Sequence, residues 1–482
     1  MMRTLSNRFK AKSMPLALSA MVLSGCATFS NDGGMSTVSQ LTEQRTGQGV
    51  ARTGSAEQET ANADTLARLL KQPLDPNTVV QIALMNNRAL QASFADLGVA
   101  EADYVQAGRM RNPGFSFNHL RGGDSLEIDR SITFDLIGLL TLPLRSGIEQ
   151  GRFEQAKLQA AISAVQLAAD ARRAFFEAVA AGQAARYMEQ VQASAEASAT
   201  LAARMAQIGN WSKLDQAREQ AFYAEATAQV ARSRQNAVST RERLTRLLGL
   251  WGNDTAFVLP DRLPELPKVA TQINDIEAQA MTQRLDIHMA KRDAEATAKG
   301  LGLTRATGFV NVLDAGYNNK SQSGQPRENG YQISVELPIF DWGGARTAKA
   351  EALYAQALHR TADTAIRARS EVREAYSAYR TNYDLARHYR DEVVPLRKKI
   401  SDEVMLRYNG MLASVFELLA DARAQASSVN TAIEAQRDFW IADTELQGAI
   451  SGTGGGGNSS SSSGSSSRMR SSSSNAASQP QH

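Results

Sequence analysis

The chain has 482 residues, of which 43% are hydrophobic and 6% aromatic, and it contains a single cysteine. Its 53 basic and 50 acidic residues are spread evenly and leave a net charge of +3, so no basic surface indicates a nucleic-acid partner. One cysteine excludes an intramolecular disulfide and a metal site built from several thiolates, while the length is ample for a sizeable core.

The N-terminus has the features of a secretion signal. Four basic residues before position 13 precede a short apolar stretch over 14–22, which is too short to span a membrane as a helix. Leu23-Ser24-Gly25-Cys26 follows and resembles the lipobox of bacterial lipoproteins. The resemblance implies removal of residues 1–25 and a covalent lipid (palmitate) on Cys26. Because Ala27 stands where Asp favours inner-membrane retention, it also implies delivery to the outer membrane. We expect no other cofactor.

Both ends of the mature chain are polar. Residues 26–74 are rich in Thr, Gly and Gln and are predicted to form an extended, lipid-anchored leader. Residues 451–482 form a Gly/Ser-rich tail that cannot bury apolar surface, so we predict that it is disordered.

Between these ends the chain is predicted to contain two copies of one unit, 75–262 and 263–450, joined at a proline-rich segment. Pairs of similar segments follow the same order at offsets of 195 to 201 residues. They are 83–90 with 280–287, Leu142-Pro143-Leu144 with Leu337-Pro338-Ile339, 170–175 with 371–376, and Gly209 with Gly410.

Each copy is predicted to contain two long helices, because Gly and Pro are almost absent from 152–208, 210–248, 345–409 and 411–447. The first of these stretches would reach about 85 Å at about 1.5 Å per residue. Its apolar residues are spaced by three and four, which is typical of coiled coils. An ordinary helical bundle is disfavoured, because globular helices average about 11 or 12 residues.

Before each long helix, apolar and polar residues alternate as in a strand. We expect one hairpin per copy, with 115–118 paired to 128–136 and 309–312 paired to 331–337, around turns at 121–125 and 318–329. Pro143 and Pro338 are expected to end the strands. The fold class is therefore mainly α with a small β part and four strands per chain. A membrane barrel needs at least about eight strands, so three chains would have to share one.

Two segments resemble the TolC-like outer-membrane efflux factor family. The run Leu337-Pro338-Ile339-Phe340-Asp341-Trp342-Gly343-Gly344-Ala345-Arg346 resembles its strand-to-helix junction, and 407–419 resembles its helix-hairpin tip. The first copy lacks the Phe-Asp-x-Gly-Gly element after Pro143. The resemblance covers about 75–450. It implies a homotrimer whose 12-stranded β-barrel crosses the outer membrane and whose α-helical barrel extends into the periplasm. The implied partners are a periplasmic adaptor (membrane fusion) protein and an inner-membrane efflux transporter.

The resemblance also implies functional positions. Glu417 and Asp421 would line a periplasmic gate that sets selectivity; the alternative is that both are exposed charges that pair with Arg423. Ala420 stands where the family often has Asp, which predicts a weaker acidic ring. The residues implied to form the adaptor-docking tips are Gly209, Asn210, Trp211, Ser212, Gly410, Met411, Leu412, Ala413 and Ser414.

No catalytic motif is present: the sequence contains no His-Glu-x-x-His, no Gly-x-Ser-x-Gly and no phosphate-binding Gly-Lys-Ser/Thr loop. We therefore expect no enzyme and no metal centre. A lipid-anchored coiled-coil spacer or adaptor without a pore remains the alternative to a duct. The cargo stays open between drugs, other small toxic compounds and metal ions, because the 14 methionines suit metal efflux but also ordinary helix packing.

Overall fold

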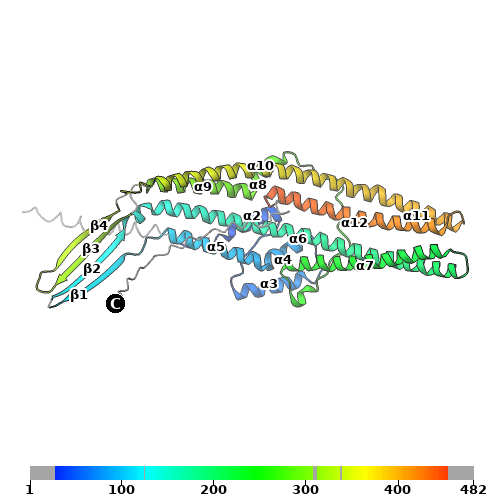
Figure 1. Ribbon diagram of the computed structural model, residues 1–482, viewed down its shortest axis with the longest axis horizontal. Helices are drawn as coiled ribbons and strands as arrows, with labels where there is room; N and C mark the ends of the chain where they lie inside the picture. Colours follow the sequence, from blue (N-terminus) through cyan, green and yellow to red (C-terminus); the bar gives the residue numbers. More distant parts are fainter. Residues whose placement is uncertain (1–27, 124, 308–311, 337–338, 454–482) are drawn as a thin grey trace, which may run out of the picture.

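The computed structural model describes residues 28–123, 125–307, 312–336 and 339–453. These residues are mainly helical with one small antiparallel sheet, as the sequence predicts. The molecule is elongated, with the sheet at one end and two helix-hairpin turns at the other (Figure 1). The predicted signal peptide, Cys26 and the Ser-rich tail from residue 454 lie outside the described residues. Among the described helices, none is both long and apolar enough to cross a membrane.

One order of elements occurs twice along the chain (Figure 1). The first set is α4 (Pro76–Asn86), α5 (Arg88–Ala107), β1 (Gly114–Gly122), β2 (Ser125–Asp135), α6 (Leu136–Gln207) and α7 (Lys213–Leu248). The second is α8 (Ile276–Gln283), α9 (Leu285–Ala306), β3 (Leu313–Gln322), β4 (Glu328–Val335), α10 (Gly344–His388), α11 (Val394–Asn409) and α12 (Val415–Ser451). A 3₁₀ turn, Gly252–Thr255, lies in the segment between the two sets.

The four strands form one antiparallel sheet in the order β1-β2-β3-β4. Its register places aromatic and aliphatic side chains opposite one another across all four strands, in the row Phe115, Ile132, Tyr317 and Tyr331. These four side chains are exposed, and Tyr331 keeps 90% of its surface. The neighbouring row, which points to the other face, is Ser116, Ser131, Asn318 and Gly330. The sheet therefore has an apolar face that is not covered within the chain and a polar opposite face.

The turn of the second hairpin is shorter than we predicted. Strand β3 starts at Leu313 and runs to Gln322, so most of the predicted turn over 318–329 is strand. The reason is that Asn318, Asn319 and Lys320 pair with β4 in spite of their polar side chains. The predicted strand residues 309–311 and the junction Leu337-Pro338 lie outside the described residues.

Helix α6 begins before the proline that was expected to precede it. Asp135 accepts a hydrogen bond from Gly138 N at 2.6 Å and caps α6 directly after β2, which places Pro143 inside the helix. The prediction that Pro143 ends the strand and turns the chain is therefore wrong. In the other long arm, a π-helical turn at Tyr389–Val393 separates α10 from α11, and Pro395 lies in the first turn of α11.

The leader is not extended over its whole length. It forms α2 (Met35–Thr46) and α3 (Ala56–Leu69), and α2 packs against α6. Val38 is fully buried there, and Arg172 of α6 donates to Thr46 O at 3.1 Å. Arg45 also donates to Gln283 O at the end of α8, so the leader joins both sets of elements. Our prediction failed because a few buried apolar residues fix a helix inside a mostly polar stretch.

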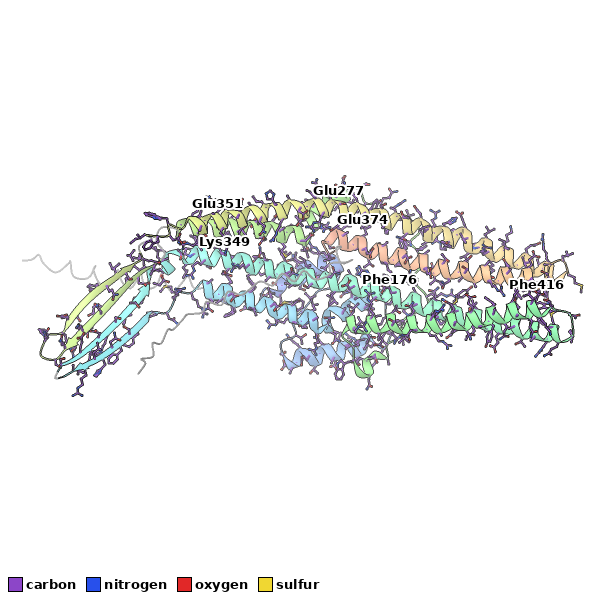
Figure 2. All side chains as sticks on the ribbon, in the orientation of Figure 1. Phe176, Glu277, Lys349, Glu351, Glu374 and Phe416 are labelled. Atoms are coloured by element: carbon purple, nitrogen blue, oxygen red, sulfur yellow. The ribbon has the colours of Figure 1, made fainter. Side chains whose placement is uncertain are left out.

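The core runs along α6, which packs against α2, α4, α5, α7, α9 and α12. Small side chains allow these neighbours to approach closely; the buried alanines of α6 include Ala161, Ala164, Ala168, Ala171 and Ala174. Phe176, which Figure 2 labels at mid-length, stacks on Trp440 of α12 with ring centroids 5.4 Å apart. Trp440 Nε1 in turn donates to Pro264 O at 3.0 Å, which fixes the proline-rich linker on the helices.

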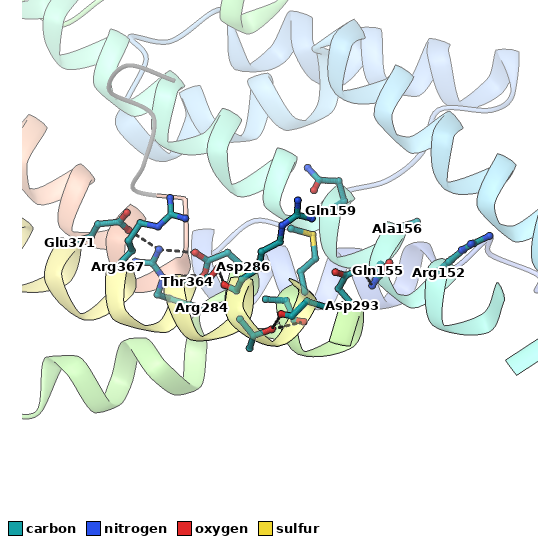
Figure 3. A pocket seen from close by; sticks show the side chains of 15 residues that line it. Arg152, Gln155, Ala156, Gln159, Arg284, Asp286, Asp293, Thr364, Arg367 and Glu371 are labelled. Carbon is teal, nitrogen blue, oxygen red and sulfur yellow. Dashed lines mark hydrogen bonds and ion pairs between the residues drawn. The ribbon is translucent and has the colours of Figure 1, made fainter. Parts of the chain in front are cut away.

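Arg284, between α8 and α9, links three helices through a buried guanidinium. It donates to both carboxylate oxygens of Asp286 and to Glu371 of α10 at 2.7 Å (Figure 3). It also donates to Ala449 O of α12 at 2.9 Å. Only 3% of the Arg284 side chain is exposed. Together with Arg152, Asp293 and other polar side chains it lines a cleft of about 610 Å³, and its hydrogen bonds give it a structural role there.

We expect Arg284→Ala to lower the free energy of unfolding by about 3 kcal/mol, because it leaves two carboxylates and a carbonyl without their partner. This expected loss of stability lies at the low end of the range for breaking buried ion pairs, because the side chains of Asp286 and Glu371 are 24% and 33% exposed. Urea unfolding followed by circular dichroism measures the change. The control is Arg292→Ala, which breaks an exposed pair with Glu295 and should cost less than about 1 kcal/mol. Equal losses in the two variants would contradict the structural role of Arg284.

Candidate functional site at the helix-hairpin ends

The two helix-hairpin turns lie at the end of the molecule opposite the sheet and have the same backbone geometry. Helix α6 ends with Asn210 N donating to Met205 O at 3.0 Å, and α11 ends with Leu412 N donating to Arg407 O at 2.7 Å. The following helices are capped alike, because Ser212 Oγ accepts from Asp215 N and Ser414 Oγ accepts from Glu417 N. The corresponding residues of the two turns lie 202 positions apart.

This offset corrects one predicted match. Gly209 has a φ of 80° and corresponds to Met411, whose φ is 60°, whereas Gly410 has an ordinary φ of −80° and corresponds to Ile208. The left-handed position that ends each helix is therefore Gly209 in the first turn and Met411 in the second. Methionine is strained in this conformation, so the second turn carries a local cost that the first turn avoids.

The tips of the two hairpins are in contact with each other. Trp211 of the first turn stacks on Phe416 of α12, with ring centroids 4.8 Å apart and an interplanar angle of 21°. Figure 2 labels Phe416 at this end of the molecule. Met411 and Leu412, by contrast, project from the second turn with 95% and 81% of their surface exposed. The second turn therefore exposes a small apolar surface, while the stacked aromatic pair holds the two turns together.

Behind the tips, one buried carboxylate connects three helices. Glu219 of α7 accepts from Ser198 Oγ of α6 at 2.7 Å and from Arg423 of α12 at 2.9 Å, and only 3% of its side chain is exposed. The guanidinium of Arg423 also lies 4.1 Å from the ring centre of Phe222. This ion pair between a buried carboxylate and a partly exposed arginine, with two further contacts, orders the hairpins relative to each other.

The two predicted gate residues have different surroundings. Glu417 lies exposed in the first turn of α12, where the helix N-terminus favours a negative charge. Asp421 is partly buried, and its Oδ2 has no hydrogen-bond partner among the described residues. Arg423 pairs with Glu219, so the alternative that it pairs with Glu417 or Asp421 is not what the structure shows.

The first hairpin contains matching acids that the sequence reasoning missed. At the offset of 202, Glu417 corresponds to Asp215 and Asp421 corresponds to Glu219. The signal that could have found them is the capping serine, Ser212 or Ser414, followed three and seven residues later by an acid. Within the described part of the chain, no three His, Cys, Asp or Glu side chains gather closely enough to hold a metal ion.

No protein-family model and no curated protein sequence matches the chain. Several solved structures do. A membrane protein from Pseudomonas aeruginosa is 20% identical with a TM-score of 0.67, over 80% of this chain and 93% of that one. The outer membrane channel CmeC of Campylobacter jejuni is 17% identical with a TM-score of 0.68, over 79% and 86%. The open state of the outer membrane channel MtrE of Neisseria gonorrhoeae is 18% identical with a TM-score of 0.65, over 80% and 89%.

The chain has the fold of TolC-like outer-membrane channels. The likeness extends over 86% to 93% of these three chains. The TolC-like resemblance of the two short segments is thereby supported at the level of the fold. We therefore look for the function in two regions, the hairpin ends and the sheet.

We expect Glu219→Ala to loosen the hairpin ends, because it removes the buried carboxylate that pairs with the partly exposed Arg423 and accepts from Ser198. Breaking such a pair costs more than about 1.4 kcal/mol, so amide hydrogen exchange in the first three turns of α12 should rise at least about tenfold. Exchange followed by mass spectrometry measures the change. Glu225→Ala removes an exposed acid from the same helix and should leave these amides unchanged; similar exchange in both variants would argue against the cross-link.

Proposed function

We propose that the chain is the outer-membrane exit duct of a tripartite efflux pump, through which small molecules or ions pass without chemical change. The observation that carries the proposal is the sheet, whose apolar face is exposed across all four strands while its opposite face is polar. That is the pattern of a barrel wall between lipid and water. A pore-free spacer or adaptor would gain nothing from this exposed apolar face.

The edges of the sheet support an oligomer. Strands β1 and β4 each have a single neighbour among the described strands, so both outer edges carry unpaired backbone groups. In lipid such edges must be paired, and a barrel needs at least about eight strands. We therefore infer a homotrimer, in which β1 of one copy pairs with β4 of the next and twelve strands close the barrel. The helices of the three copies would then form a tube through the periplasm.

The hairpin ends suit the docking of a periplasmic adaptor, which would connect the duct to an inner-membrane transporter. Each chain offers two turns side by side, with Met411 and Leu412 as exposed apolar contacts. The predicted tip residues all lie in or next to these turns. The transporter would select the cargo, among drugs, other small toxic compounds and metal ions.

Reconstitution tests the duct directly. Purified protein in a planar bilayer should give stepwise conductance, and a spacer or adaptor should give none. In the trimer, Glu417 and Asp421 of three copies would surround the periplasmic mouth, where like charges repel unless cations enter. Glu417→Ala combined with Asp421→Ala should therefore lower the preference for cations and weaken block by multivalent cations.

The control for this recording is Glu225→Ala combined with Glu242→Ala, which removes the same charge from the exposed side of α7 away from the hairpin ends. Its reversal potential in a salt gradient should equal that of the wild type. Should the variant at Glu417 and Asp421 also keep the wild-type reversal potential, the gate assignment would be wrong and the conducting duct would stand.

The lipid anchor is tested separately. Labelled fatty acid should enter the wild-type protein and not Cys26→Ser, because the acyl chains need the cysteine. Since the barrel itself would insert in the membrane, the exported Ser variant should keep part of its efflux. Acylation of the Ser variant, or a mature N-terminus other than residue 26, would refute the anchor.

A further inference from the structure

An arginine-rich groove lies where the helices meet the sheet. Its walls are the end of α5 and the link to β1 on one side and the first turns of α6 on the other, and its volume is about 810 Å³. The acids that line it are Asp103 and Glu149. The arginines that line it are Arg109, Arg111, Arg145 and Arg152, so the lining has a net positive charge.

Two of these arginines are available to an anion. Arg152 pairs with Glu149 at 2.6 Å, and Arg111 lies 3.6 Å from Asp135. For Arg109 and Arg145, no ion pair is found with any described residue. A guanidinium presents paired N–H donors that match phosphate oxygens, so two such groups in one groove favour a phosphate ligand over a simple halide.

Exposed apolar side chains line the groove or directly precede Arg145 in the chain. Phe29 and Met110 line the groove and are 57% and 46% exposed. On α6, Leu140 and Leu144 are one turn apart, directly before Arg145, and are 69% and 44% exposed. Exposed apolar groups next to cations are typical of protein surfaces that lie at the headgroup level of a bilayer.

The N-terminal segment brings the groove close to the membrane. Ser30 donates to Glu101 Oε1 from its backbone N at 2.6 Å and from its Oγ at 2.5 Å, and Glu101 is buried on α5. Cys26 lies four residues before Ser30, and four residues span at most about 14 Å. Acyl chains on Cys26 would therefore enter the bilayer within about this distance of Ser30, which directly follows Phe29 of the groove.

We propose that the groove binds the phosphate headgroup of an anionic phospholipid in the leaflet that faces the periplasm. Arg109 and Arg145 hold the phosphate, and Phe29 and Leu144 lie along the acyl chains. The inference rests on the proposed function, because the barrel and the lipid on Cys26 place this level of the molecule at the membrane surface. The bound lipid would fix the height of the junction between sheet and helices relative to the bilayer.

Native mass spectrometry of the full, acylated protein tests the site, with phosphatidylglycerol and phosphatidylcholine as probes. The wild type should retain phosphatidylglycerol in preference to phosphatidylcholine. R109Q combined with R145Q should weaken the binding of phosphatidylglycerol about tenfold or more, because both cations that face the headgroup are lost. R109K combined with R145K keeps the charge without the paired donors and should bind with intermediate affinity.

The matched control, R204Q combined with R232Q, removes two exposed arginines from α6 and α7 outside the groove and should bind phosphatidylglycerol like the wild type. Three results would overturn the site: unchanged binding by the glutamine variant, an equal loss in the control, or displacement of the lipid by inorganic phosphate. Loss of trimers with lipid binding intact would also overturn it and assign the arginines to contacts between copies. Conductance of the wild type, recorded separately, shows whether the duct itself is correct.

Discussion

Close packing along α6 is the constraint on which the structure depends. This helix contacts elements from the leader, from its own half and from the second half, and alanines at most of its buried positions let all of them approach. A larger side chain at Ala164 or Ala171, both fully buried, would push neighbouring helices apart along a shared interface. The packing along α6 determines how the long helices, the linker and the sheet at one end are arranged.

The two halves form the same turns and kinks with different residues. Both hairpin ends need a left-handed residue, which is Gly209 in one and Met411 in the other. At the kink between the first two helices of each half, Asn87 donates to Leu247 O and Arg284 donates to Ala449 O, so each kink is tied to the last turn of its closing helix. Shared geometry with different side chains explains why the similarity between the halves is faint in the sequence.

The sequence predicted what depends on local periodicity: the long helices, the hairpins and the turns at both tips. The predictions failed where the structure of a segment depends on contacts with residues that are distant in the sequence. A helix in the leader forms because Val38 is buried against α6, and β3 extends through Asn318 and Asn319 because β4 pairs with them. The family resemblance was enough to select Glu417 and Asp421 as candidate gate residues. The ion pair of Glu219 with Arg423, by contrast, joins residues 204 positions apart, and no local sequence pattern predicts it.

That pair also constrains how a duct of this kind would open. Separating the two hairpins of one chain would break the stack of Trp211 on Phe416, worth about 0.5–1.5 kcal/mol, and the ion pair of the buried Glu219 with the partly exposed Arg423. Contacts between copies at the mouth would instead include the repulsion of like charges from Glu417 and Asp421. In the proposed trimer, these contacts within each chain favour an opening in which the two hairpins of that chain move together.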